Sequence, residues 1–146
     1  MPDTLIDANV LIDIATADAR WGAWSEAALE RCADDGHLHI NPIIYAEVSI
    51  AYRRIEELEL VLPASLFMRT ALPWEAAFLA GKCFEAYRRR GGTRRSPLPD
   101  FYIGAHAAVA GMRLLTRDAG RYRAYFPRLR LITPDRSAIE RSDGRR

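Results

Sequence analysis

The first residues of the chain constrain its fold most strongly, because a short apolar segment there ends in a carboxylate. Thr4, Leu5 and Ile6 follow one another without polar alternation, which predicts a buried strand. A helix is predicted to begin soon afterwards, near residue 10, where apolar residues become frequent. Asp7 therefore lies where a strand leads into a helix, and open parallel sheets bind their ligands at that edge. An aspartate in this place can equally cap the helix, so the segment alone leaves both roles open.

The rest of the chain predicts one α/β domain. Further strands are expected at residues 37–40, 113–116 and 129–133, and helices at residues 21–35, 43–54, 55–62, 74–90, 101–111 and from 119. This alternation favours a parallel sheet of about four to five strands flanked by helices. Residues 65–73 give no clear prediction. We expect the domain to span residues 1–134 and residues 135–146 to form a flexible polar tail.

Length and composition agree with a single globular domain of 146 residues, 49% hydrophobic and 27% charged. No signal-peptide pattern and no apolar run of about 20 residues is present, so we expect a cytoplasmic protein without membrane contact. Cys32 and Cys83 lack metal-ligand spacing and are expected to be reduced, buried thiols. His106 has no ligand spacing with His37 or His39, so we expect it to pack inside the fold.

Three further acidic residues are expected near Asp7. Glu47 has apolar neighbours three and four positions away on both sides, so it faces the core, where a carboxylate needs a partner. An ion pair with Arg54 is the structural alternative. Asp118 follows the strand at residues 113–116, and Asp100 opens the helix that precedes this strand. Each of these two aspartates also has a simpler explanation as a residue that stabilises a helix N-terminus.

A convergence of these four carboxylates would require a cation. Two carboxylates about 4 Å apart repel by roughly 4 kcal/mol at an effective dielectric constant near 20. Oxygen ligands select hard ions, so Mg²⁺ or Mn²⁺ is expected. Such an ion polarises a phosphate group and ionises a water molecule for attack on phosphorus. The acidic residues therefore indicate metal-assisted hydrolysis of a phosphate ester.

Arginine accounts for nearly all of the basic residues, since Lys82 is the only lysine among 21 lysines and arginines. We attribute the total mainly to genomic base composition, but the clustering of arginines needs a separate explanation. Five of them surround a pair of glycines: Arg88, Arg89, Arg90, Arg94 and Arg95. Guanidinium groups bind phosphates well, so we expect this segment to contact nucleic acid, the alternative being a solvated loop.

Four segments of the chain together resemble the PIN-domain ribonucleases, and within them the VapC-type toxins of bacterial toxin–antitoxin pairs. The segments are LIDANVLID at residues 5–13, YAEV at 45–48, PDFYIGAHA at 99–107 and LTRD at 115–118. Each is weakly specific alone, but their order and spacing are specific together. The resemblance covers nearly the whole chain.

The resemblance implies a Rossmann-like sheet and a Mg²⁺-dependent endoribonuclease, with Mn²⁺ as a substitute. It also implies a homodimer that is inhibited by a cognate antitoxin. The acidic quartet of the family corresponds to Asp7, Glu47, Asp100 and Asp118, with Asp7 and Asp100 as the most direct metal ligands. Asn9 and Thr116 match positions that orient the acids or the substrate. Asp13 lies one helical turn after Asn9 and is expected at the surface.

Three other functions are alternatives to a toxin ribonuclease. A phosphohydrolase of the haloacid dehalogenase type would need a second aspartate where Asn9 stands and a lysine at the site, for which Lys82 is poorly placed. A PIN-like module could bind RNA or a partner without cutting, although a pure binder gains nothing from clustered like charges. A housekeeping PIN nuclease of RNA processing would differ from a toxin in its neighbouring gene.

Overall fold

The computed structural model describes residues 2–134 and contains one parallel sheet. The strands are β1 (Thr4–Ile6), β2 (Leu38–Ile40), β3 (Phe67–Arg69), β4 (Arg113–Leu115) and β5 (Leu131–Ile132). Their order is β3-β2-β1-β4-β5, and every neighbouring pair is parallel. The expected α/β sheet is therefore confirmed. The tail predicted at residues 135–146 lies outside the described residues.

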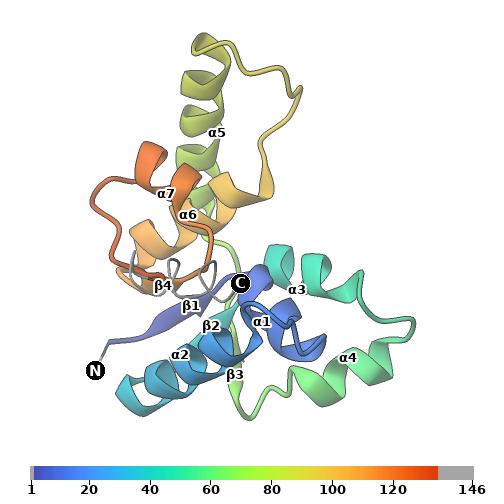
Figure 1. Ribbon diagram of the computed structural model, residues 1–146. Coiled ribbons are helices and arrows are strands. Elements are labelled where there is room, and N and C mark those ends of the chain that lie inside the picture. The colour runs from blue at the N-terminus through green and yellow to red at the C-terminus, as the bar shows by residue number, and fades with distance from the viewer. Residues whose placement is uncertain (1, 135–146) are drawn as a thin grey trace.

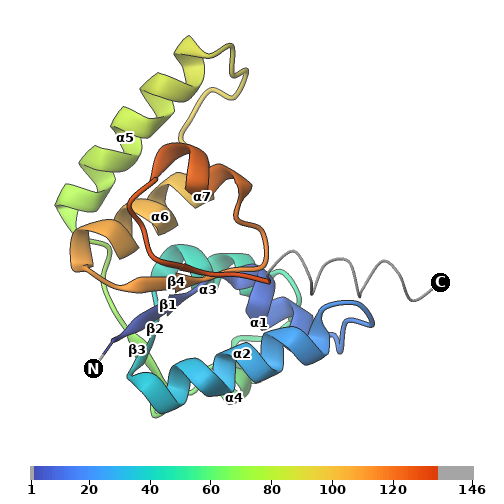
Figure 2. The same cartoon turned by 60° about the vertical axis from the view of Figure 1, so that its left-hand side comes forward.

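Seven helices within residues 2–134 cover the sheet, and two groups of them lie on its opposite sides (Figures 1 and 2). Their bounds are α1 (Ala8–Ala15), α2 (Gly22–Asp35), α3 (Pro42–Ser49), α4 (Ile55–Val61), α5 (Trp74–Arg89), α6 (Pro99–Ala110) and α7 (Gly120–Tyr125). Figure 2 shows α5, α6 and α7 on one side and α1, α2 and α4 on the other. Helix α3 contacts both groups through α1 and α6. Since β1 is central, its carboxyl end lies in the middle of the sheet edge.

Two helix boundaries differ from the prediction for identifiable reasons. Helix α1 begins at Ala8, earlier than expected, because Asp7 has extended backbone and its side chain accepts a hydrogen bond from the Ala8 N–H. Helix α3 ends at Ser49 and not at residue 54. The hydroxyl of Ser49 donates to the Ala46 carbonyl at 2.6 Å, a competing bond that weakens the continuation of a helix.

Strand β3 was not predicted at all. It is an edge strand, and only Phe67 of its three residues is buried, while Met68 and Arg69 are exposed. A strand this short with one buried side chain carries no readable alternation. Its position is set by pairing with β2, where Leu38 lies opposite Phe67.

The core lies between the central strands and the helices on both sides. Leu5, Ile6, Leu114 and Leu115 are fully buried, as expected for strands covered on both faces. Helix α6 packs closely, as its small residues predict, because a Cβ on Gly104 would lie 2.4 Å from a ring carbon of Phe126. The close approach of α6 to the segment after α7 thus depends on this glycine.

The two cysteines and His106 are placed as predicted. Cys32 and Cys83 are buried free thiols. His106 is fully buried, and Asn41 Nδ2 donates to its Nδ1 at 3.0 Å. Among the helices of residues 2–134, none has the length and apolarity that a bilayer crossing requires.

Candidate active site

Asp7 stands directly after β1 and is 4% exposed. Its Oδ1 accepts the Ala8 N–H at 2.8 Å, so it does cap α1. Its Oδ2 accepts the Tyr122 hydroxyl at 2.8 Å and the Thr116 hydroxyl at 2.9 Å. Capping and a second role are therefore compatible, because the two oxygens serve different groups of donors. The side chain is fixed from both sides.

Glu47 lies on α3 and is held by no ion pair with Arg54, whose guanidinium instead lies 3.4 Å from Glu56. The alternative explanation for Glu47 is thus wrong. Its Oε1 is buried and has no hydrogen-bond partner among the described residues. Burial, followed by the charges of Asp7 and Asp100, raises the pKa of Glu47 to about 7. A buried acceptor without a donor indicates that a group outside the chain is meant to satisfy it.

Asp100 occupies the first turn of α6, as predicted. Its Oδ1 lies 3.4 Å from the Tyr122 hydroxyl, and its Oδ2 accepts from Arg121 Nη1 at 3.4 Å. Burial raises the pKa of Asp100, the nearby Arg121 opposes this shift, and the charge of Asp118 adds to it. Asp100 is therefore within electrostatic reach of the other acidic residues.

One cavity of about 380 Å³ brings three of the four predicted acids together. It is lined by Asp7, Ala8, Asn9, Ile12, Glu47, Ile50, Ala51 and Asp100. Asp118 does not line it. The backbone N–H of Asp118 donates to the Thr116 hydroxyl at 3.2 Å, and its charge acts on Asp100. The structure thus places Asp118 beside the other three and not among them.

Burial, and then the charges of neighbouring acids, disfavour the ionised form of the acids in this cavity. Burial is the main cause that raises the pKa of Asp7 to about 6, and Asp100 adds to it, while the hydrogen bonds from Tyr122 and Thr116 act in the opposite direction. Buried carboxylates that raise one another's pKa are typical of sites that bind cations or perform acid–base chemistry.

The donor set fits a hard divalent cation, although the side chains form no finished cage. Across residues 2–134, no group of three or more His, Cys, Asp and Glu side chains is already arranged to hold a metal ion. Asp7 Oδ2 is engaged by hydroxyl donors, and Arg121 lies against Asp100. Three features of the cavity favour such a cation. The acidic ligands are all oxygen donors, the carboxylates repel one another, and the buried Glu47 Oε1 has no hydrogen-bond donor among the described residues.

Asn9 and Thr116, the two residues predicted to support the acids, are hydrogen-bonded to each other and to Asp7. Asn9 Nδ2 lies 3.1 Å from the Thr116 hydroxyl and 3.4 Å from Asp7 Oδ2, while Asn9 Oδ1 accepts the N–H of Arg117 at 3.3 Å. These bonds join α1 to the segment after β4. They hold Asp7 and the backbone leading to Asp118 in a fixed relation.

The prediction from the sequence was wrong for Asp13 and did not include Tyr122. Asp13 was expected at the surface, which is wrong: it is 2% exposed, Ser25 Oγ donates to it at 3.0 Å, and Arg117 Nε does so at 2.6 Å. Tyr122 was not singled out, yet its hydroxyl reaches both Asp7 and Asp100. The only sequence signal was indirect, since a buried tyrosine needs a partner for its hydroxyl.

The arginine segment forms a folded turn at the end of α5. Arg88 Nη1 donates to the Arg94 carbonyl at 2.6 Å, and the Gly92 N–H donates to the Tyr87 carbonyl at 3.0 Å. A Cβ on Gly92 would lie 2.2 Å from the Tyr87 ring, so the turn closes onto α5. A hollow of about 800 Å³ is lined there by Phe84, Arg88, Gly92, Thr93 and Arg95. The segment leads into α6 and thus toward Asp100, but none of its arginines lines the acidic cavity.

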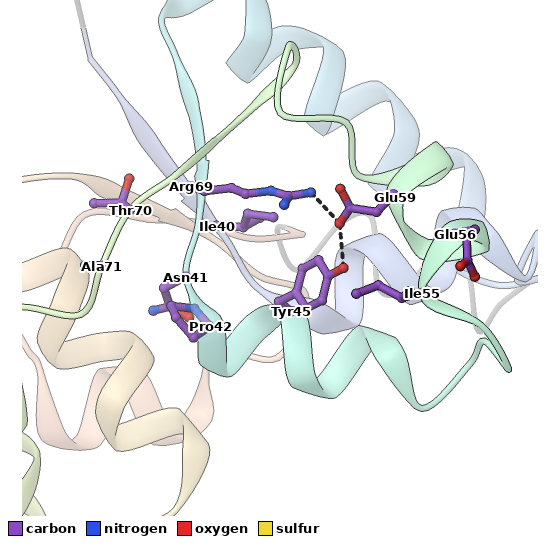
Figure 3. A pocket seen from close by; sticks show the side chains of 10 residues that line it. All are labelled: Ile40, Asn41, Pro42, Tyr45, Ile55, Glu56, Glu59, Arg69, Thr70 and Ala71. Carbon is purple, nitrogen blue, oxygen red and sulfur yellow. Dashed lines mark hydrogen bonds and ion pairs between the residues drawn. The ribbon is translucent and has the colours of Figure 1, made fainter.

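A second cavity, of about 760 Å³, lies between α3, α4 and the end of β3 (Figure 3). Figure 3 shows Tyr45 and Arg69 both directed to Glu59, which accepts from the tyrosine hydroxyl at 2.6 Å and from Arg69 Nη2 at 2.7 Å. Arg69 compensates the charge of Glu59, and Arg54 lies 3.4 Å from Glu56, so both acids that line this cavity have a cationic partner. Helix α3 contributes to both cavities, Tyr45 to this one and Glu47 to the acidic one.

Comparison with known proteins gives a family and a fold. The family model described as PIN domain matches residues 4–127. The structure of VapBC2 from Rickettsia felis bound to a promoter DNA fragment is similar with a TM-score of 0.69 and 17% identity, covering 91% of this chain and 99% of that one. A toxin–antitoxin complex from Klebsiella pneumoniae is similar with a TM-score of 0.66 and 24% identity, covering 90% and 98%. No curated protein matches the chain in sequence.

Proposed function

The chain belongs to the PIN domain family, and we propose from this that it is a metal-dependent endoribonuclease that acts as the toxin of a toxin–antitoxin pair. PIN domains are generally nucleases, and the fold matches chains of toxin–antitoxin complexes. The observation that carries the proposal is the buried, unpartnered Glu47 Oε1 in one cavity with Asp7 and Asp100. An unpaired carboxylate in one cavity with two others is unfavourable unless a cation or an attacking water uses it.

Asp7, Glu47 and Asp100 would hold Mg²⁺ or Mn²⁺ in this reaction. The bound ion would polarise the scissile phosphate and lower the pKa of water. Asp7 Oδ1 accepts one hydrogen bond and retains acceptor capacity, whereas Oδ2 accepts from two hydroxyl groups and from Asn9 Nδ2. Asp118 would act from the rim, where it increases the negative potential at Asp100.

Glu47 would either complete the ligand set of the cation or orient the attacking water. Its buried Oε1 has no donor among the described residues, so it is available for either role. Hydrolysis by water would then break the phosphodiester bond without a covalent intermediate on the protein. Substitution of Glu47 by Gln keeps the shape of the side chain and removes the charge.

The direct test is cleavage of RNA by the purified protein. Cleavage should occur with Mg²⁺ or Mn²⁺ and stop with EDTA. Glu47→Gln protein purified in parallel should be inactive, which controls for contaminating ribonucleases. Cleavage that persists in EDTA would refute the metal-dependent mechanism, and so would a Glu47→Gln variant as active as the wild type.

The folded arginine turn supports RNA as the substrate. A basic hollow with Phe84 in its wall offers phosphate contacts and an aromatic face, as single-strand binding sites do. Alanine substitution of three loop arginines should flatten the salt dependence of RNA binding by up to about 0.7 in slope per lost contact; the three are Arg89, Arg94 and Arg95. The matched control replaces three exposed arginines elsewhere: Arg31, Arg53 and Arg128. If the salt dependence of RNA binding were the same in both triple variants, the loop would be an ordinary solvated surface.

An antitoxin partner follows from the toxin assignment. Ile50 is 85% exposed although it lines the acidic cavity, so an apolar side chain of a partner can anchor there. A basic side chain from the same partner, such as arginine, would reach the carboxylates. A small upstream gene for a DNA-binding protein should therefore restore growth on co-expression and yield a stable complex. The absence of such a gene would favour housekeeping RNA processing.

The protein is further proposed to form a homodimer in the cytoplasm. Trp74 and Phe78 are 89% and 69% exposed and lie one helical turn apart on α5, which gives a second copy an apolar contact. Light scattering with size-exclusion chromatography should report twice the chain mass, and Trp74→Ala should shift the population toward monomer. A monomeric wild-type protein would remove this element of the proposal.

A further inference from the structure

Tyr122 is buried to 1% exposure, yet its only polar side-chain atom is directed at the acidic site. The residue lies on α7, which follows β4 and Asp118 in the chain. Its hydroxyl donates to Asp7 Oδ2 at 2.8 Å and lies 3.4 Å from Asp100 Oδ1. No other side chain contacts both of these acids among the hydrogen bonds of residues 2–134.

We propose that Tyr122 is a positioning residue of the active site, which sets Asp7 and Asp100 in one relation to each other for cation binding. This inference rests on the proposed metal-dependent function. A phenol carries a single proton, so the short bond to Asp7 and the longer contact with Asp100 share one donor. The phenol oxygen therefore fixes the distance between two side chains that would otherwise repel each other.

The second donor on the same oxygen makes the geometry specific. Thr116 reaches Asp7 Oδ2 from the end of β4 at 2.9 Å, while Tyr122 reaches it from α7 at 2.8 Å. Oδ2 also accepts from Asn9 Nδ2 at 3.4 Å, and Oδ1 accepts the Ala8 N–H, so the carboxylate of Asp7 cannot rotate without losing hydrogen bonds. Tyr122 thus acts through Asp7 and Asp100, and it does not line the cavity itself.

The test is Mn²⁺ binding to Tyr122→Phe by titration calorimetry, which does not depend on turnover. Hydrogen-bond partners of metal ligands typically contribute about 10–100-fold to metal affinity. We expect a loss of about that size in Mn²⁺ affinity, with kcat/KM for RNA reduced at fixed Mn²⁺ and KM for RNA unchanged. Phenylalanine keeps the buried ring, so near-UV circular dichroism should report an intact fold.

Tyr125→Phe is the matched control on the same helix. The ring centroid of Tyr125 lies 5.0 Å from that of Phe101 and 4.8 Å from the guanidinium carbon of Arg90. Within residues 2–134, the side-chain hydroxyls that donate to Asp7 or Asp100 are those of Thr116 and Tyr122, not that of Tyr125. Its Mn²⁺ affinity should equal that of the wild type. Wild-type affinity in Tyr122→Phe, an equal loss in both variants, or an unfolded Tyr122→Phe protein would overturn the inference. Wild-type protein that binds no Mn²⁺ would instead refute the proposed function on which the inference rests.

Discussion

Lowering the pH should stabilise the metal-free protein, because Asp7 takes up a proton more readily when folded. Burial raises its pKa from 3.8 to about 6. For an acid with a raised pKa, the folded state binds the proton first, so the stabilisation is complete below pH 3.8 and is lost as the pH rises through 6. One pKa unit corresponds to about 1.4 kcal/mol, so the full effect is about 3 kcal/mol, of which about 1.4 kcal/mol develops between pH 8 and pH 5.

The assay is urea unfolding in EDTA at pH values from 8 to 5. Glu47 has a pKa of about 7 and contributes in the same direction, whereas the lowered pKa of buried His106 opposes the trend. Asp7→Asn removes the contribution of Asp7, together with the part of the Glu47 pKa shift that the charge of Asp7 causes, while asparagine can still accept the Ala8 N–H. The stabilisation on acidification should shrink by about 1.4 kcal/mol or more in this variant. Saturating Mn²⁺ should flatten the wild-type profile, because metal binding favours the ionised acids.

Equal pH dependence in the wild-type and Asp7→Asn proteins would refute this reasoning. It would mean that the carboxylate is not destabilised by its surroundings. The destabilisation of ionised Asp7 and Glu47 supports the proposed cation, together with the unpartnered Glu47 Oε1 in the acidic cavity.

Two further predictions concern the scaffold around the site. Asp13→Asn should lower the free energy of unfolding by about 3 kcal/mol, which is the lower end of the range for a broken buried ion pair, because Arg117 is about one third exposed. Unchanged stability in urea unfolding would show that the ion pair is dispensable. Gly104→Ala should destabilise by about 1–3 kcal/mol, because its Cβ would collide with Phe126. In the control Gly81→Ala, no atom lies within 4 Å of the new Cβ, so the substitution should stabilise α5 by about 0.5–1 kcal/mol. Melting temperatures that shift in the same direction in both glycine variants would contradict the packing argument.

The parts of the fold that follow local rules could be predicted from the sequence. Asp7 comes directly after a run of apolar residues, and Ile43 and Ile44 precede Glu47 at helical spacing, so the sheet edge and the helix face that these acids occupy could be predicted. The apolar residues after Glu47 gave no such guide, because α3 ends at Ser49 and Ile50 is exposed. Leu5, Ile6, Leu114 and Leu115 of the central strands are fully buried because both faces of these strands are covered. The short edge strand β3 lacks such a pattern and depends on its partner strand.

The contacts between distant residues could not be predicted in this way. Tyr122 and Asp7 are 115 positions apart, and Arg117 and Asp13 are 104 apart. Asp13 has a polar appearance in the sequence, and only the approach of Arg117 and Ser25 explains its burial. Periodicity indicates which face of a helix is buried, but it does not identify the partner of a buried charge.

The most direct test of the account is Asp100→Asn, measured twice: RNA cleavage in Mn²⁺ and the melting temperature in EDTA. Asparagine keeps the shape of the side chain and removes one of the charges that raise the pKa of Asp7 and Glu47. We predict that most cleavage is lost while the metal-free protein melts at the same temperature as the wild type or higher, because active sites hold unfavourable charge. If Asp100 only stabilised the start of α6, the variant would instead stay active and lose up to about 1 kcal/mol of stability. A destabilised but active Asp100→Asn protein would contradict the acidic metal site.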